Sequence, residues 1–254
     1  MQPSKQLPHQ MNQISIKAER FIEHPCRILF TGKAGSGKTT LAVHLINTVL
    51  RSQVDRFIFV CPTFFTQDAF RSLDDIVHPE RDVWVDPNNE TFIEIKSQLL
   101  NQAHYCREKN IPNLKTLVFV DDLSGLSIIH GGRIGAFANF AIQTRHLGCS
   151  CFVVTQQAKA VSPAFRDNVN AVLAFPCQRK DEIRWLEDEY ASADFPNQLM
   201  RQMILQAWRG YGNKNCDEWG THFLFILLAD RSPPRYFADF DYSLHSNLKG
   251  SFRE

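Results

Sequence analysis

The stretch Gly32–Thr39 reads GKAGSGKT and matches the phosphate-binding pattern G-x-x-x-x-G-K-[ST] in full. Its glycines let backbone N–H groups close around phosphate oxygens, and the helix that begins near Gly37 directs the positive end of its dipole at them. In this pattern Lys38 reaches the β- and γ-phosphates, and the hydroxyl of Thr39 ligates Mg²⁺. The sequence therefore predicts a nucleoside triphosphate, ATP, bound with Mg²⁺.

The residues expected to bind the nucleotide form one continuous run. They are Gly32, Lys33, Ala34, Gly35, Ser36, Gly37, Lys38, Thr39 and Thr40. The run is preceded by the buried-strand pattern Arg27–Phe30 and followed by apolar residues at helical spacing from Thr40 to Ile46. A glycine-rich turn without a ligand is the alternative, and this strand–loop–helix order argues against it.

A second motif places two carboxylates directly after an apolar strand. Leu117–Val120 is followed by Asp121 and Asp122, and ligands bind at the carboxyl ends of such parallel strands. The pair resembles a Walker B motif, in which Asp121 holds Mg²⁺ through water and Asp122 orients and deprotonates the attacking water. A base in this position favours a motor-type ATPase over a switch GTPase or a small-molecule kinase. Asp122 is one methylene shorter than the commoner Glu, and a purely structural acid is its alternative.

Length and composition indicate one globular α/β domain without a basic surplus. The chain has 254 residues, 44% of them hydrophobic, and its 28 basic and 27 acidic residues give a formal net charge of +1. The overall charge therefore gives no sign of nucleic-acid binding. Any DNA-binding surface has to be local or built by several subunits that line a channel.

The seven cysteines predict a reducing compartment. They show neither a C-x-x-C pair nor metal-ligand spacing, and they lie at positions 26, 61, 106, 149, 151, 177 and 216. The longest apolar run, Phe223–Ala229, is too short to cross a bilayer, and the glutamine-rich start does not resemble a secretory signal. We therefore expect a soluble protein without a membrane span.

Strands and helices alternate from Arg27 onward, which predicts a mostly parallel sheet with helices on both faces. The expected strands are residues 27–30, 56–60, 83–85, 116–120, 151–155, 170–175, 221–228 and 236–240, the last two as a closing hairpin. The expected helices are residues 38–50, 90–108, 133–146, 180–191 and 198–208. We expect a flexible arm over residues 1–13, an ATPase domain over 14–242 and a polar tail over 243–254.

Four segments resemble the genome-packaging ATPases of large double-stranded DNA viruses and virophages, poxviruses among them. They are His24–Phe30, Phe59–Thr63, Val120–Asp122 and Val154–Gln156. This family belongs to the FtsK/HerA superfamily of P-loop motors, and the resemblance covers about residues 22–240. The phosphate loop alone is generic, whereas the His-Pro lead-in, the Pro-Thr pair and the Thr-Gln pair are together more specific.

The resemblance implies the additional-strand variant of the P-loop NTPase fold. In that fold the strand that ends in Gln156 lies between the phosphate-loop strand and the acidic strand. Gln156 then meets the γ-phosphate as a polar sensor, with Gln157 as the second candidate and a simple strand-end cap as the alternative role. The family often has Arg-Pro after the sensor, and this chain has Gln157-Ala158 instead.

Motors of this family form rings in which a neighbouring subunit supplies an arginine to the reacting phosphate. The candidates in this chain are Arg133, Arg145 and Arg166. Arg145 ends a helix just before a core strand, so it lies at the sheet edge opposite its own nucleotide and is suited to act in trans. Arg133 and Arg166 follow the carboxyl ends of strands, and a surface salt bridge is the alternative role for each.

The resemblance implies an ATP-driven motor that translocates double-stranded DNA and packages a viral genome into a preformed capsid. The implied partners are double-stranded DNA, further copies of the chain in a ring of five or six, and the packaging vertex of the capsid. The implied location is the virion or the host cytoplasm. The alternatives are another DNA pump of the superfamily, a small-molecule kinase, and an assembly factor whose nucleotide only holds a ring together.

Overall fold

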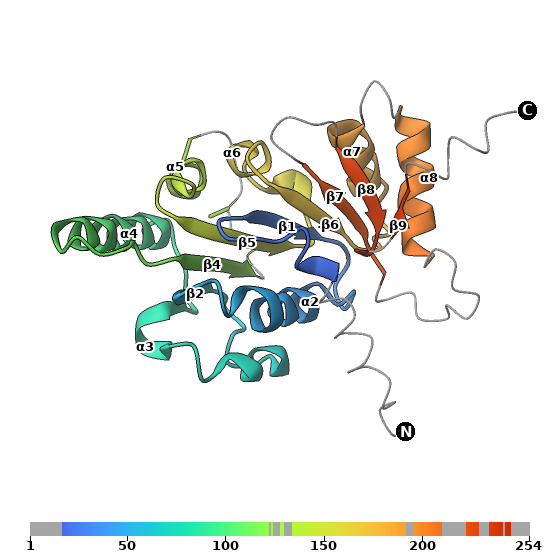
Figure 1. Ribbon diagram of the computed structural model, residues 1–254. Coiled ribbons are helices and arrows are strands. Elements are labelled where there is room, and N and C mark those ends of the chain that lie inside the picture. Colours follow the sequence, from blue (N-terminus) through green and yellow to red (C-terminus); the bar gives the residue numbers. More distant parts are fainter. Residues whose placement is uncertain are drawn as a thin grey trace, which may run out of the picture.

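A nine-stranded, mostly parallel sheet forms the centre of the molecule (Figure 1). The computed structural model describes residues 17–121, 123, 128–129, 134–191, 196–209, 222–228, 234–240 and 242–244. The strands are β1 (Arg27–Thr31), β2 (Arg56–Val60), β3 (Val83–Trp84), β4 (Thr116–Asp121), β5 (Cys149–Thr155), β6 (Ala171–Ala174), β7 (Leu224–Leu227), β8 (Arg235–Ala238) and β9 (Tyr242–Ser243). Their order across the sheet is β3-β2-β4-β5-β1-β6-β7-β8-β9, and only the contacts from β6 to β9 are antiparallel.

Strand β5 is inserted between the phosphate-loop strand β1 and the acidic strand β4. Val154 of β5 is level with Phe30 of β1 on one side and with Asp121 of β4 on the other. This order confirms the additional-strand fold that the sequence predicted. All seven residues of β5 are buried, which explains why its sequence is apolar throughout instead of alternating.

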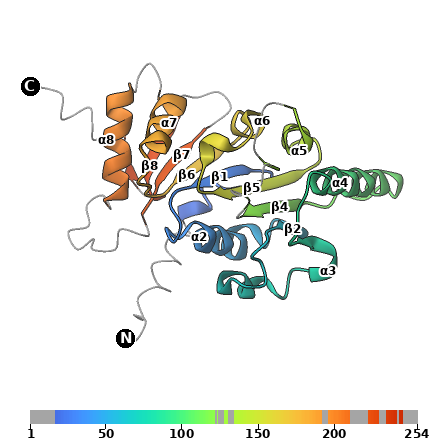
Figure 2. The same cartoon turned by 180° about the vertical axis from the view of Figure 1, so that it is seen from behind.

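Helices cover both faces of the sheet, as the two opposite views show (Figures 1 and 2). The longer helices are α2 (Lys38–Leu45), α4 (Thr91–Glu108), α5 (Ala136–Gln143), α7 (Lys180–Tyr190) and α8 (Asn197–Trp208). Short helical segments are η1 (Ile46–Leu50), η2 (Asp68–Leu73), α3 (Pro79–Asp82), η3 (Ala158–Ala160) and α6 (Pro163–Arg166). Segment η1 is a π-helical turn that continues α2 to Leu50, so together they account for the predicted helix 38–50.

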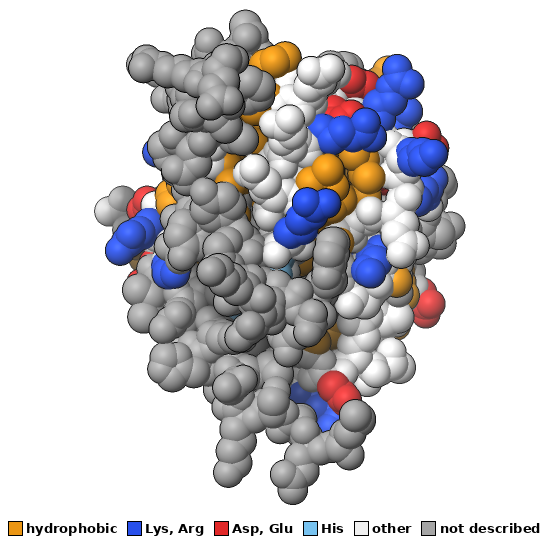
Figure 3. Space-filling model, turned by 90° about the vertical axis from the view of Figure 1, so that its right-hand side faces the viewer, with side chains coloured by type: hydrophobic (Ala, Val, Ile, Leu, Met, Phe, Trp, Pro, Cys, Tyr) orange, Lys and Arg blue, Asp and Glu red, His pale blue; other side chains and the backbone are white. Residues whose placement is uncertain are grey.

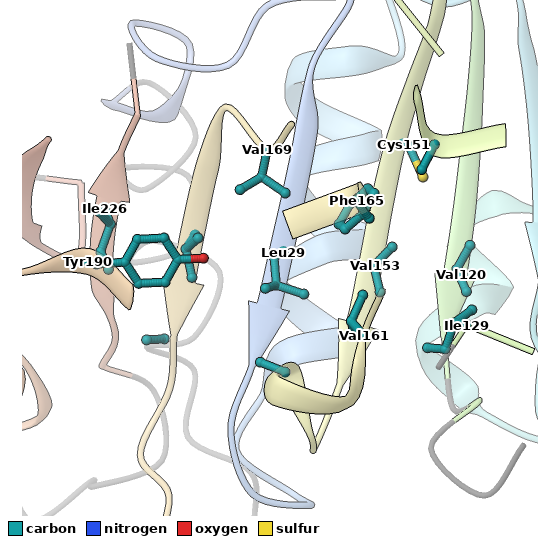
Figure 4. Packing of buried hydrophobic residues seen from close by; sticks show 14 of the residues in the cluster. Leu29, Val120, Ile129, Cys151, Val153, Val161, Phe165, Val169, Tyr190 and Ile226 are labelled. Atoms are coloured by element: carbon teal, nitrogen blue, oxygen red, sulfur yellow. The ribbon is translucent and has the colours of Figure 1, made fainter. Parts of the chain in front are cut away.

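The two faces of the sheet build two separate hydrophobic clusters. Side chains of successive strand residues point to opposite faces, so Leu29 of β1 packs under α4 to α8 whereas Phe30 packs against α2. Figure 4 shows the first cluster, in which Val153 of β5 lies between Leu29 and Val120. Cys149 and Cys151 both belong to this cluster, as predicted for two residues on one face of a strand.

The described cysteines behave as core residues. All six are free thiols, and five of them are buried. Burial raises the pKa of the Cys26 and Cys149 thiols to about 12, which keeps them protonated and unreactive. Cys216 lies outside the described residues.

Element boundaries differ most from the prediction around α5 and the closing hairpin. Helix α5 spans only Ala136–Gln143 of the predicted 133–146, and turns continue to Gly148, which has a positive φ of 61°. Strands β7 and β8 are shorter than expected, and the turn between them lies largely outside the described residues. Most of the predicted arm and tail is also outside them, so the domain limits remain predictions.

The lead-in residue His24 fastens the amino end of β1 to its neighbour β5. Its Nδ1 lies 2.8 Å from Oγ of Ser150, and the same hydroxyl accepts the backbone N–H of Cys26 at 3.0 Å. The backbone N–H of His24 donates to Oε1 of Gln53 at 2.9 Å. His24 therefore has an anchoring role at the sheet edge opposite the carboxyl ends of the strands. Burial, and to a lesser degree the positive charge of Lys115, lower its pKa.

We expect the free energy of unfolding to fall as the pH drops below about 6.5, the ordinary pKa of histidine, because the unfolded chain protonates His24 before the folded chain does. Above that pH the ring is neutral in both states and makes no pH-dependent contribution. One such group changes stability by at most about 1.4 kcal/mol per pH unit. Urea unfolding of the His24→Asn variant at a series of pH values should therefore show a shallower acid-side loss than the parent. Equal slopes for the two proteins would contradict this role.

Candidate nucleotide-binding site

The glycines of the loop Gly32–Thr39 are required by its backbone. Gly32 has a φ of +147°, and a Cβ there would lie 2.6 Å from Cβ of Phe175, so only glycine lets the loop leave β1 this close to the end of β6. The N–H of Lys33 then donates to the carbonyl of Pro176 at 3.1 Å. Gly37, with a φ of 86°, turns the chain into α2, which starts at Lys38. The loop is therefore held by β6 as well as by its own turns.

Lys38 is buried and folds back across the loop. Its Nζ donates to the carbonyl oxygens of Gly32 at 2.9 Å and of Lys33 at 2.6 Å, and it lies 3.4 Å from Oγ of Ser36. These contacts hold the ammonium group inside the curve of the loop, where the motif predicts phosphate oxygens. A phosphate group there offers charged acceptors in place of neutral carbonyls, and charge-assisted hydrogen bonds are the stronger ones.

Thr39 and Asp121 bring the two motifs into direct contact. The Thr39 hydroxyl donates to Oδ2 of Asp121 at 2.7 Å, although the residues are 82 positions apart in the chain. A hydroxyl beside a carboxylate is a hard oxygen donor pair, which fits Mg²⁺. Among the described residues no group of three or more His, Cys, Asp or Glu side chains could hold a metal ion. Mg²⁺ with a nucleotide needs no such group, because waters and phosphate oxygens complete its shell.

A cavity of about 320 Å³ opens above the loop at the carboxyl ends of β4 and β5. It joins the loop, the acidic strand and the sensor candidate in one space. Its lining residues are Ala34, Gly35, Ser36, Gly37, Lys38, Thr39, Thr40, Gln67, Asp121, Val154, Thr155 and Gln156. Of the predicted nucleotide-binding residues, Gly32 and Lys33 do not line the cavity, since they contact the end of β6 instead.

The structure distinguishes between the two sensor candidates. Gln156 is exposed at the end of β5 and lines the cavity. Gln157 does not line it, and its backbone N–H donates to Oγ1 of Thr155 at 3.0 Å. Of the two, Gln156 lines the cavity, and its role as a sensor stays a prediction.

Three residues that line the cavity were not predicted as site residues from the sequence: Val154, Thr155 and Gln67. Thr155 is the last residue of β5, and its place beside Gln156 at the strand end was a usable signal. Gln67 lies seven residues beyond β2, in the turn that follows Cys61–Thr63, and no local pattern marks it. Its position depends on how that turn packs.

The three arginines considered for the role in a neighbouring subunit differ in their positions and contacts. Arg145 is exposed in the turn between α5 and β5, at the amino end of β5 and therefore at the edge opposite Gln156. Arg166 is held within its own chain: it pairs with Glu189 at 2.7 Å, donates to the carbonyl of Val161 at 3.0 Å and lies over the ring of Trp185. These contacts count against Arg166 as a residue that reaches a neighbouring subunit.

Arg133 and Asp122 both lie outside the described residues. The role of Asp122 as a base therefore stays a prediction from its place next to Asp121. Within the part of the chain that the structure describes, no helix has the length and apolar character needed to cross a membrane.

Solved structures of other proteins share this architecture. The genome packaging NTPase B204 from Sulfolobus turreted icosahedral virus 2, in complex with ATP-gammaS, superposes with a TM-score of 0.55 at 15% identity, over 85% of this chain and 98% of that one. B204 described as the DNA-packaging ATPase from Sulfolobus turreted icosahedral virus gives a TM-score of 0.56 at 12% identity with the same coverage. The pCW3 conjugation coupling protein TcpA with ATPgS gives 0.51 at 16% identity, over 86% of this chain and 61% of that one. At these identities the likeness shows the shared fold.

The family assignment comes from the sequence. No curated protein matches the chain. The family described as Poxvirus A32 protein matches residues 13–199, which is more than half of the chain and includes the phosphate loop, the acidic strand and Gln156. The resemblance to viral packaging ATPases is thereby confirmed, and the chain belongs to the Poxvirus A32 protein family of P-loop ATPases.

Proposed function

We propose that the chain is an ATP-hydrolysing motor that translocates double-stranded DNA and packages a viral genome into a preformed capsid. The observation that carries this proposal is the single cavity in which Lys38, the Thr39–Asp121 pair and Gln156 meet. A kinase or a switch also binds phosphates on such a loop. A polar sensor on an inserted central strand, in a chain of this family, favours a motor.

Each residue of the cavity has a role in this proposal. Thr39 and Asp121 hold Mg²⁺, which when bound neutralises charge on the phosphate oxygens. Lys38 exchanges its contacts with the loop carbonyls for the β- and γ-phosphates. Asp122 accepts a proton from the attacking water, and Gln156 responds to the presence or loss of the γ-phosphate.

The segment after the sensor is tied to helix α7, which supports transmission of the nucleotide state. Helix α7 packs against η3. Glu182, in the first turn of α7, is only 5% exposed, and burial raises its pKa, whereas the backbone N–H groups of Lys159 and Ala158 act on its carboxylate by lowering that pKa. In this proposal a movement of Gln156 is passed to α7 through the packing of η3 against that helix.

The charge distribution supports DNA contacts made jointly by several subunits. The net charge is +1, and on the face that carries α7 and α8 basic side chains lie scattered among polar and apolar ones (Figure 3). A homo-oligomeric ring of five or six subunits repeats each small basic region around a channel, and the capsid vertex is the second partner. We place this motor in the virion or the host cytoplasm.

A different DNA pump is the second candidate function. The fold is shared with TcpA, which is described as a conjugation coupling protein. The membership in the Poxvirus A32 family favours the capsid as the destination of the DNA. A ring assembly factor that does not hydrolyse ATP for movement is the third candidate, and the experiments below separate it from a motor.

We expect duplex DNA to stimulate ATP turnover by the wild-type protein. Lys38→Ala should lower turnover by at least about 10²-fold, because a cation that meets charge developing on the phosphates is removed. Release of phosphate, followed with and without duplex DNA, measures both effects. Phosphorylation of an added acceptor instead of release of free phosphate would identify a kinase.

Replacement of the two adjacent acids should separate the base from the metal ligand. Asp122→Asn should lower hydrolysis by about 10²-fold or more, since a general base is lost, while binding of ATP with Mg²⁺ is retained. Asp121→Asn should instead weaken the Mg²⁺-dependent part of ATP binding. Equilibrium titration with a fluorescent ATP analogue, with Mg²⁺ and with EDTA, measures binding. DNA packaging that survives complete loss of hydrolysis in Asp122→Asn would exclude the motor.

A mixing experiment tests whether Arg145 acts on the neighbouring site. Arg145→Ala and Lys38→Ala rings should each be inactive, but random mixing should restore activity in about a quarter of the sites, where an intact Lys38 meets an intact Arg145 from the next subunit. Arg107→Ala is the matched control, because Arg107 is an exposed arginine in the last turn of α4. It should not lower activity. If the mixed rings recover no ATPase activity, Arg145 does not act on the neighbouring site and has only a surface role.

A further inference from the structure

Gln67 lies in the nucleotide cavity but has no part in the roles described above. It follows β2, and the strand order β2-β4-β5-β1 puts it on the far side of the acidic strand from the phosphate loop. Across the cavity from the loop, the order is therefore Gln156, then Asp121, then Gln67. In the function proposed above, the loop N–H groups hold the phosphates that stay with ADP and Lys38 reaches on to the γ-phosphate, so Gln67, beyond Asp121, would lie at the γ-phosphate end.

The turn that carries Gln67 is firmly mounted. The backbone N–H of Gln67 donates to the carbonyl of Thr63 at 3.1 Å, and its Nε2 donates to the Thr63 hydroxyl. Phe64 and Phe70, on either side, stack at 4.8 Å between ring centroids, and both rings also contact Phe59 of β2. Thr63 belongs to the Pro-Thr pair on which part of the family resemblance rests. Its hydroxyl thus orients the Gln67 amide.

The hydrogen bond to Thr63 leaves the carbonyl oxygen of the Gln67 amide unused. In the part of the chain that the structure describes, Oε1 of Gln67 has no hydrogen-bond partner. A carbonyl oxygen only accepts hydrogen bonds, and ionised phosphate oxygens also only accept them. The group at this end of the cavity that donates hydrogen bonds is the water that attacks the γ-phosphate.

We propose that Oε1 of Gln67 accepts a hydrogen bond from the attacking water, and that Thr63 is the positioning residue that fixes the Gln67 amide. In the step, the water oxygen forms a bond to the γ-phosphorus while the bond to the bridging oxygen breaks, and that electron pair leaves with ADP. One water proton passes to the base, which is Asp122 in the function proposed above. The other proton stays on the oxygen, in the hydrogen bond to Gln67, which is never protonated.

The test measures ATP hydrolysis without DNA or capsid, so it does not depend on packaging. Gln67→Ala should lower kcat by about 10- to 100-fold, because the water loses its alignment, with KM for ATP changed less than about twofold. Binding of a fluorescent non-hydrolysable ATP analogue and the thermal unfolding midpoint should match the wild type. Gln67→Asn keeps the amide on a side chain one methylene shorter and should also lower kcat, which provides a second variant if Gln67→Ala folds poorly.

Thr63→Val tests the positioning role, because valine keeps the shape and removes the hydroxyl. It should lower kcat in the wild-type background and have no further effect in the Gln67→Ala background. Thr66→Val is the matched control: Thr66 lies in the same turn and its hydroxyl donates to the Thr63 carbonyl, without contact to the Gln67 amide. It should leave kcat unchanged.

Three results would overturn the proposal. They are an unchanged kcat in Gln67→Ala, a raised KM at constant kcat, which would make Gln67 a nucleotide-binding residue, and multiplicative losses in the double variant. A wild-type protein without ATP turnover would contradict hydrolysis by the chain itself, and this outcome is distinguishable because it does not depend on Gln67.

Discussion

The insertion of β5 between β1 and β4 is the constraint on which the nucleotide site depends. Two strand spacings separate β1 from β4, about 9–10 Å, and this gap gives the phosphates room above the end of β5. The pairing of Val154 with both Phe30 and Asp121 brings the three strand ends level. Thr39 can then reach Asp121 from the first turn of α2. Without the insertion the acidic strand would lie beside the phosphate-loop strand, and Gln156 would not lie between the loop and Asp121.

The sequence predicted those parts of the site that depend on local patterns or on strand order. The loop, Asp121 and Gln156 are continuous with strands whose apolar runs are unmistakable, so their meeting at one edge follows from parallel pairing. Gln67 could not be predicted from the sequence, because its position depends on how Phe64 and Phe70 pack against each other after the end of β2. The anchoring role of His24 could not be predicted for a similar reason. Its partner Ser150 is 126 residues away in the sequence, and the two meet at the sheet edge opposite the nucleotide cavity.

Arg166 was a candidate for the arginine supplied to a neighbouring subunit because it follows the carboxyl end of a strand. Its contacts within its own chain show why that position alone does not identify such an arginine. The guanidinium group pairs with Glu189 of α7 and covers Trp185, so it joins α6 to α7. Glu182 joins α7 to the segment just after Gln156 from the other direction. The backbone that follows the sensor strand is thus bound to α7 at two points.

The polar groups of the cavity are divided by chemistry as well as by position. Donors lie on the phosphate-loop side, where Nζ of Lys38 now contacts loop carbonyls and, in the function proposed above, would meet the β- and γ-phosphates. Acceptors lie on the far side, where Asp121 and Gln67 line the cavity and, in the proposals above, would contact Mg²⁺ and the attacking water. In phosphoryl transfer the nucleophile and the leaving oxygen are in line on opposite sides of the phosphorus. In the proposed reaction the leaving oxygen is on the loop side, so the attacking water would enter from the side of β4 and β2, which is where the acceptors are.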